Sequence, residues 1–316
     1  MTPLEFEASN EPRWSEFEGL LGKEDKNLDS ERFLSLYRTC CEQLALAQAR
    51  GFPAHVIERL SIMTAQGHQI VYRRSDFGVA RVGRVLMREF PEMVRAHRSY
   101  VLVAALILLV PALAIGIATY ARPDLILSLV DSRTAEEFER MYAPTAESIG
   151  RTRDAGSNWM MFGYYIMNNI GIAFQCYVTG IIFGVGSVLF LGFNGAFGGA
   201  VAGYVANLGF SGTFFPFIAT HSAFELTAIV LCGAAGLRLG HSVLLPGRLP
   251  RLLALQTAAR ETSVIIFGAA AMLVIAAAIE AFWSSAAWVE PRAKYICAFA
   301  CWTLVGLFFL RRSHAS

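Results

Sequence analysis

The sequence predicts an all-α membrane protein in which a polytopic helix bundle of about six spans follows a cytosolic helical domain. Two observations support this fold class. Hydrophobic residues make up 55% of the 316 residues and charged residues only 16%, whereas soluble domains usually carry about 25% charged residues. The charged residues are also unevenly distributed along the chain. Residues 1–98 hold 14 basic and 14 acidic side chains, whereas the apolar blocks begin at Tyr100. These blocks approach or reach the length of about 20 residues that a bilayer requires.

Residues 1–76 are predicted to form the cytosolic helical domain. Within residues 30–49, five side chains fall on one face of a helix. They are Phe33, Leu36, Tyr37, Cys40 and Leu44. Gly51 and Pro53 end this helix, and a second helix follows over residues 53–74. Because short helices are marginal alone in water, we expect these to pack on each other or on a partner.

Residues 77–98 are predicted to form a basic amphipathic helix at the membrane surface. At 100° per residue, four arginines share one face of this helix and the apolar residues lie on the other side. The arginines are Arg81, Arg84, Arg88 and Arg95, and the apolar residues are Val79, Val82, Leu86, Phe90 and Met93. A row of arginines directly before a membrane span fits a helix in the headgroup layer that binds anionic lipids. The alternative interpretation is a solvated face of the soluble domain.

Residues 99–316 are predicted to form the transmembrane domain. The first span is expected at Tyr100–Tyr120, and a net-acidic extracytoplasmic segment, residues 121–157, follows it with one helix that starts at Ser132. Five further spans are expected near residues 162–190, 194–210, 221–239, 264–282 and 293–310. The division of residues 158–239 rests on a glycine-rich sequence, in which spans can be short, tilted or broken.

The distribution of arginine predicts that both termini face the cytoplasm of a bacterium, with the spans in its inner membrane. Residues 50–98 carry nine arginines against four acidic residues, and arginines also follow the fourth span and end the chain. Positive residues favour the cytoplasmic side, and an even number of spans places all three regions there. Of 27 basic residues 24 are arginine, which suggests a GC-rich bacterial genome, and the net charge of +2 gives no indication of nucleic-acid binding.

One carboxylate interrupts the most apolar part of the chain. Glu225 is the only Asp, Glu, Lys or Arg between Asp154 and Arg238, and His221 shares its helix face at a spacing of four residues. At 1.5 Å per residue, Glu225 lies about 20 Å from Arg238, which places it in the outer part of a bilayer core about 30 Å thick. The same depth argument predicts an intramembrane polar cluster of Asn168, Asn169, His221, Glu225 and Glu280.

Three interpretations of this polar cluster stay open. A charged group inside a membrane costs about 2.5–3.5 kcal/mol on insertion scales, so it is kept where it faces the bundle interior and has partners. The cluster could tie broken helix ends together, hold an ion, proton or small solute, or form a catalytic or metal site. A histidine and two glutamates can bind zinc with an open position. Because the pair four residues apart is the only local motif, the sequence predicts no metal, no cofactor and no catalytic residue.

Small residues predict close packing of the membrane helices. They recur every four residues in GxxxG patterns, which allow helix backbones to approach closely in lipid. The residues expected at such packing seams are Gly180, Gly184, Asn194, Gly195, Gly199, Gly203, Gly233 and Gly236. The pattern leaves open whether the seams lie within one chain or between two, and we expect a homo-oligomer.

Several sequence segments along the chain, taken together, resemble a known protein family. They are MNNIGIAFQCYVTGIIFGVGSVLFLGFNGAFGGAVAGY, HSAFELTAIVLCGAAGLRLG, PGRLPRLLALQTAAR and IEAF, with PRWSEFEGLL, SLYRTC, GHQIVYRR and REFPEMVR nearer the N-terminus. Together they resemble the stage II sporulation protein M family of integral membrane proteins, in its longer, non-sporulation type. The family's usual Pro-His-Gly…Glu-Leu-Pro is replaced here by Thr220-His221-Ser222…Glu225-Leu226-Thr227. Without the prolines and the glycine, we expect a more regular helix at this point.

The resemblance implies a non-enzymatic role in the cell envelope. The family member of spore formers is a membrane scaffold that recruits two partner proteins for peptidoglycan degradation, and the longer members are commonly encoded beside a MoxR-type ATPase and RDD-family membrane proteins, which are therefore candidate partners. The residues that match the family pattern are Asn168, Asn169, Asn194, Gly195, His221, Glu225, Leu226, Gly233, Gly236, Arg238 and Glu280. We expect a scaffold or assembly component. A channel or transporter that uses the polar cluster is the alternative.

Overall fold

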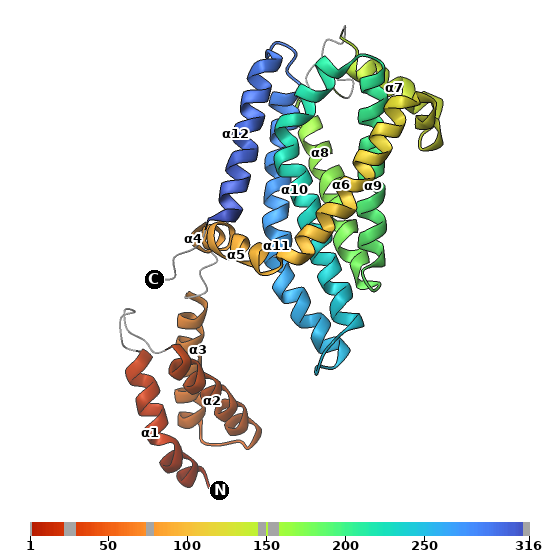
Figure 1. Cartoon of the computed structure of the whole chain (residues 1–316). Helices are drawn as coiled ribbons and strands as arrows, with labels where there is room; N and C mark the ends of the chain where they lie inside the picture. The colour runs from red at the N-terminus through yellow and green to blue at the C-terminus, as the bar shows by residue number, and fades with distance from the viewer. Residues whose placement is uncertain (1, 22–29, 74–78, 145–149, 151–157, 312–316) are drawn as a thin grey trace. The chain divides into compact units, whose positions relative to one another are not determined.

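The computed structural model describes residues 2–21, 30–73, 79–144, 150 and 158–311, and every regular element in these ranges is a helix. The chain divides into two compact units, Met1–Val82 and Gly83–Ser316 (Figure 1). The domain boundary predicted at residue 76 lies among residues 74–78, which are outside the described residues, as are parts of the predicted segment 121–157.

Among its described residues, the N-terminal unit contains three helices that share one core. They are α1 (Pro3–Leu21), α2 (Ser30–Ala49) and α3 (Ala54–Arg73). Of the face predicted for α2, Phe33, Leu36 and Cys40 are buried in this core. The largest fully buried side chain is Trp14 of α1, which donates a hydrogen bond from Nε1 to Oε1 of Gln43 over 2.6 Å. Residues from all three helices thus close one apolar core in which the buried indole is hydrogen-bonded.

Charged side chains connect α1 to α3 at the edge of this core. Arg59 lies 2.7 Å from Glu11 and 2.9 Å from Glu18, and its guanidinium stands over the Trp14 ring. The hydrogen bond from Arg59 holds the pKa of Glu11 below its usual value. This ion pair therefore favours the folded unit above the ordinary pKa of glutamate, and its contribution is lost as the pH falls through the lowered value. Because Glu11 is half-exposed, solvent screening keeps this contribution small.

Residues 79–96 form a helical segment with a change of helix type. It consists of α4 (Val79–Arg84), the π-helical turn η1 (Val85–Glu89) and α5 (Phe90–Ala96). Phe90 is 2% exposed and packs against Phe308 and Phe309, and it occupies the space where Gly268 lacks a side chain. The segment predicted to lie in the headgroup layer therefore turns part of its apolar side toward protein.

In the described part of the chain, the second unit is a bundle of six long helices. They are α6 (Arg98–Ala121), α8 (Asn158–Val178), α9 (Val185–Asn207), α10 (Ser211–Leu244), α11 (Arg251–Ile279) and α12 (Pro291–Leu310). Five of them are long and apolar enough to cross a membrane, namely α6, α9, α10, α12 and α11 with its π-helical extension η4 (Glu280–Ser284). The sixth, α8, has 21 residues and is not among these five candidates. The unit also includes η2 (Pro123–Ser128) and α7 (Ser132–Tyr142), which lie at one end of the bundle (Figure 1).

The helix boundaries differ from the predicted spans between residues 158 and 244. A span was expected over residues 162–190, but α8 ends at Val178 and α9 begins at Val185. Between them lie the short η3 (Thr179–Ile181) and a turn in which Phe183 and Gly184 have positive φ values of 52° and 81°. Left-handed backbone of this kind interrupts a right-handed helix, and glycine adopts it without strain. The span expected at 221–239 lies within α10, which is longer than expected and has 34 residues.

Helix α10 occupies the centre of the bundle. It packs against α6, α8, α9, α11 and α12. Of the five candidate spans, it is the one with the largest fraction of buried residues. Figure 1 shows α12 at the outside of the bundle and α6 and α9 side by side. The hairpin between α10 and α11 lies at the end of the bundle opposite α7 (Figure 1). The centre of the bundle is therefore formed by the helix that contains His221 and Glu225.

A row of glycines on α9 packs against the backbone of α6 and brings these two helices into close contact. We call this contact the α6–α9 seam. A Cβ atom on Gly195, Gly199 or Gly203 would overlap the backbone of α6 at Leu108, Ala112 or Gly116 respectively. Such rows of small residues allow the dispersion contacts that hold membrane helices together. The seam lies within one chain.

Glycines also allow other segments of the chain to pack closely against α10. Gly180 lies against the backbone of Gly236, and Gly184 against that of Gly240. Gly233 faces the side chain of Leu191, so a Cβ there would clash with it. Asn194, also expected at a seam, donates a hydrogen bond to the carbonyl of Phe190 in its own helix over 2.7 Å. The glycine-rich turn after α8 is thus packed directly onto the last third of α10.

Candidate functional site

The structure brings together three of the five polar residues predicted to cluster. His221 and Glu225 lie one turn apart on α10, and Glu280 begins the π-helical turn η4 at the end of α11. One nitrogen of His221 and one carboxylate oxygen from each glutamate all lie within 4.8 Å of one another. We call these three residues the polar triad. Its members come from two helical segments, and Glu225 and Glu280 lie 55 positions apart in the sequence.

His221 is held at both ring nitrogens. Its Nδ1 lies 3.0 Å from the hydroxyl oxygen of Ser284 and its Nε2 lies 3.8 Å from Oε2 of Glu225. The ring of Phe217 packs edge-on against it at 5.3 Å between centroids. His221 is 5% exposed and Ser284 is fully buried. The serine contact fixes the imidazole ring so that Nε2 is turned toward the carboxylate.

A buried lysine, which the sequence did not identify, joins α12 to this region. Lys294 is 1% exposed, and its ammonium group donates a hydrogen bond to the backbone carbonyl of Ser284 over 2.7 Å. The Thr220 hydroxyl donates to the carbonyl of Lys294 over 3.2 Å. The hydrogen bonds therefore link α10, η4 and α12 around the polar triad. One signal was available, since Lys294 is the only lysine after Lys26.

The two asparagines predicted for the cluster lie on α8. Asn168 donates a hydrogen bond from its amide to Oδ1 of Asn169 over 2.9 Å. Asn169 is 3% exposed, and within the described residues its amide nitrogen has no hydrogen-bond partner. One turn before it, Tyr165 packs with Ala277 and Ala281 of the α11–η4 region. Asn169 is thus a buried amide beside the helix that carries Glu280.

Exposed aromatic side chains mark the level of the triad in the bundle. Trp159, at the start of α8, and Trp288, in the connection from η4 to α12, are 74% and 85% exposed. Trp159 packs on Phe282, two residues after Glu280. Tryptophan is enriched at membrane–water interfaces. The triad therefore lies inside the bundle at the end that carries α7, the same end as these two exposed tryptophans.

The opposite end of α10 carries an ion pair. Arg238 donates to Glu261 of α11 over 2.9 Å, and Nε2 of His97 lies 3.7 Å from the same carboxylate. This pair joins α10 to α11 close to their hairpin. The two helices are therefore linked by polar side chains near both of their ends.

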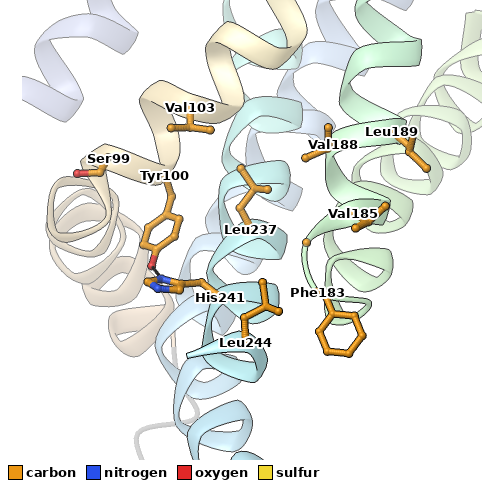
Figure 2. Close-up of a pocket in the computed structure, with 11 residues that line it drawn as sticks. Ser99, Tyr100, Val103, Phe183, Val185, Val188, Leu189, Leu237, His241 and Leu244 are labelled. Atoms are coloured by element: carbon orange, nitrogen blue, oxygen red, sulfur yellow. Dashed lines mark hydrogen bonds between the residues drawn. The ribbon is translucent and has the colours of Figure 1, made fainter. Parts of the chain in front are cut away.

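A largely apolar cavity of about 570 Å³ opens between α6, α9 and α10. Figure 2 shows Tyr100 and His241 pointing toward each other at one side of this cavity, with a hydrogen bond between the phenol and Nδ1. His241 lies 20 residues after His221 on α10, or about 30 Å along a helix. A second cavity, of about 290 Å³, lies between η1–α5 and α11–α12 and has an apolar lining. Neither cavity contains the polar triad.

The four arginines predicted at the membrane surface differ in their surroundings. Arg81 and Arg84 are exposed. Arg88 is also exposed and lies 3.6 Å from Glu92. Arg95 donates a hydrogen bond to the carbonyl of Phe309 at the end of α12 over 3.2 Å. Three of the arginines thus leave their charge at the surface, and Arg95 instead caps a helix end.

Comparison with known proteins gives two matches to protein families. The family described as Stage II sporulation protein M matches residues 81–285, and a Domain of unknown function (DUF8413) matches residues 4–73. No curated protein and no solved structure matches the chain. The first match covers α5 to α11, including the polar triad, and amounts to about two thirds of the chain. The chain therefore belongs to the stage II sporulation protein M family of membrane proteins.

Proposed function

We propose that the protein is a non-enzymatic scaffold, a component that assembles a complex at the bacterial inner membrane. The observation that carries this proposal is the N-terminal unit, which has its own core and its own family match. A unit that folds around its own core is suited to present a binding surface while the helix bundle anchors it. With α8 as the sixth span, both termini lie in the cytoplasm, as the arginine distribution predicts, and the partner is a cytosolic protein.

The packing of the membrane domain supports anchoring rather than transport. The α6–α9 seam brings helix backbones into direct contact, and the hydrogen bonds around the polar triad join neighbouring helices to each other. The two cavities described above are largely apolar, and no residue of the triad lines them. A transport path would require polar groups that face water along the bundle.

A groove on the N-terminal unit is the part of its surface that we assign to the partner. It has a volume of about 360 Å³ and lies between α1 and α3. Ile62, which is half exposed, lines it together with Glu18 and Glu58. An exposed aliphatic side chain with a charged rim is a common arrangement at protein interfaces.

Deleting residues 2–73 is expected to remove the cytosolic partners that crosslink to the protein in cells, while the helix bundle still inserts. The point variant Ile62→Glu is expected to have the same effect, because it places a charge on the lining of the groove at a half-exposed position outside the core. Leu4→Glu, at a position that is 79% exposed on α1, is the control and should keep the partners. Quantitative mass spectrometry of crosslinked material measures this. Partners that persist after the deletion would contradict the proposal.

We also propose that Arg81, Arg84 and Arg88 bind anionic lipid headgroups. Each basic residue near a membrane surface is worth about 1 kcal/mol, so replacing all three by Glu is expected to lower the affinity for anionic lipid at least tenfold. The ratio of anionic to zwitterionic lipid that co-purifies with the protein measures the change. Arg133→Glu and Arg292→Glu, at exposed positions of the α7 end, should leave the ratio unchanged. An equal loss in this control would refute a headgroup site.

A further inference from the structure

We propose that the polar triad, His221, Glu225 and Glu280, is a binding site for one divalent zinc-class metal ion. This goes beyond the scaffold role, and it differs from the expectation of no metal that the local sequence motif supported. A histidine nitrogen and two carboxylate oxygens are ligands of the kind found in zinc sites with three protein ligands and one open position. The third ligand lies far along the chain from the other two, so that no short motif could identify it.

The distances require only a small contraction. Zinc binds nitrogen and oxygen at about 2.0–2.2 Å, so tetrahedral ligands lie about 3.4 Å apart. In the triad the three candidate ligand atoms lie within 4.8 Å of one another, and the pair on α10 is separated by 3.8 Å. Small rotations of the two flexible carboxylate side chains close this difference while the imidazole stays in place.

The surroundings of His221 match those of a metal-ligating histidine. Such a histidine commonly bonds through its second nitrogen to a neighbouring group, which fixes the ring for the metal. Here Ser284 contacts Nδ1 and leaves Nε2 facing Glu225. Ser284 is itself buried, and its carbonyl accepts a hydrogen bond from Lys294. The ring is therefore already held in the direction that binding requires.

Two further features point to a ligand at this place. Glu280 and Ser284 lie on a π-helical turn, a rare conformation that is frequent at functional sites. The buried Asn169 on the adjacent α8 has an amide nitrogen with no acceptor in the described part of the chain. An unpartnered buried amide on a helix that packs against the end of α11 is the kind of group that a bound water satisfies.

The charge of the site favours a cation. Two carboxylates close together in a low-dielectric region repel each other. Lys294 contributes one positive charge, but its ammonium group is directed to the carbonyl of Ser284. A divalent ion bound directly by both carboxylates offsets their charge, and it joins α10 to the end of α11 at the α7 end of the bundle.

The test uses the full-length protein, purified in detergent without a histidine tag, stripped with a chelator and reloaded with Zn²⁺ or Co²⁺. Elemental mass spectrometry is expected to give one metal ion per chain, and Co²⁺ is expected to show the intense visible bands of four-coordination without thiolate charge-transfer bands. His221→Ala, Glu225→Gln and Glu280→Gln should each weaken binding by at least about 100-fold, and Ser284→Ala by about 10–100-fold. Glu290→Gln, an exposed carboxylate at the same end, is the control and should bind normally.

Substoichiometric metal in the wild-type protein, or a six-coordinate Co²⁺ spectrum, would overturn the site without the need for any variant. Equal binding by a folded Glu225→Gln/Glu280→Gln double variant would do the same. The protein without residues 2–73 is expected to keep its metal. The ligand variants test the metal site and the deletion of residues 2–73 tests the scaffold role. One proposal can therefore fail while the other stands.

Discussion

Gly199→Leu is expected to prevent stable assembly of the membrane domain, whereas Gly198→Leu, one residue earlier on the same helix, is expected to be tolerated. A Cβ atom on Gly199 would overlap the backbone of Ala112 in α6, while a Cβ atom on Gly198 meets nothing within 4 Å. Overpacking a well-packed interior costs about 1–3 kcal/mol even where side chains can adjust. A backbone cannot adjust in this way, so we expect a larger effect at Gly199.

The comparison is measured on the detergent-solubilised protein by thermal unfolding and by size-exclusion chromatography. Gly199→Leu should aggregate or lose at least ten degrees of thermal stability, as a cost of several kcal/mol implies. Gly198→Leu should remain monodisperse and close to the wild type. Similar stability of the two variants would mean that the α6–α9 seam does not hold the helices together.

Trp14→Ala is expected to leave the N-terminal unit with little or no net stability, so that it opens often. Trp14 is 2% exposed, packs edge-on with Phe6, and is hydrogen-bonded to Gln43. Replacing a buried tryptophan by alanine costs about 3–5 kcal/mol, and small domains are stable by only about 5–15 kcal/mol. A three-helix unit is expected near the lower limit of this range because it can bury only a limited apolar area.

Thiol labelling of the full-length chain reports this unfolding. Cys40 is 2% exposed and lies in the core between α2 and α3, so it reacts with a maleimide only when the unit opens. With Cys41 replaced by Ser, peptide mapping after labelling should show fast modification of Cys40 in Trp14→Ala and slow modification in the parent protein. Leu4→Ala, at an exposed position, should behave like the parent. Slow labelling in both variants would show that Trp14 is not required for the core.

The sequence predicted elements well where hydrophobic periodicity or length was strong. The spans expected at 100–120 and 293–310 correspond to α6 and α12, and the helix expected at 30–49 corresponds to α2. The break at residues 179–184 was not predicted, because glycine-rich sequence is compatible with both a tight turn and a close helix contact. The packing of Phe90 against Gly268 was also not predicted, because it depends on a contact between residues 178 positions apart.

In the candidate site, too, the sequence predicted some of the residues and missed others. The pairing of His221 with Glu225 follows from helical spacing, and counting residues from the membrane boundary was enough to place Glu280 at the same depth. Ser284 and Lys294 were missed. A serine near the end of a span is a common residue, and its role here depends on the π-helical turn that directs it toward His221.

The α6–α9 seam has a consequence for the order in which the protein is made. The apolar α6 leaves the ribosome long before α9, and it is hydrophobic enough to enter the bilayer alone. The glycine face of α9 offers little apolar surface to lipid, so we expect α9 to reach its final position only when it meets α6. The first span would then act as a template during synthesis, and the central α10 would complete the bundle only after that pair has formed.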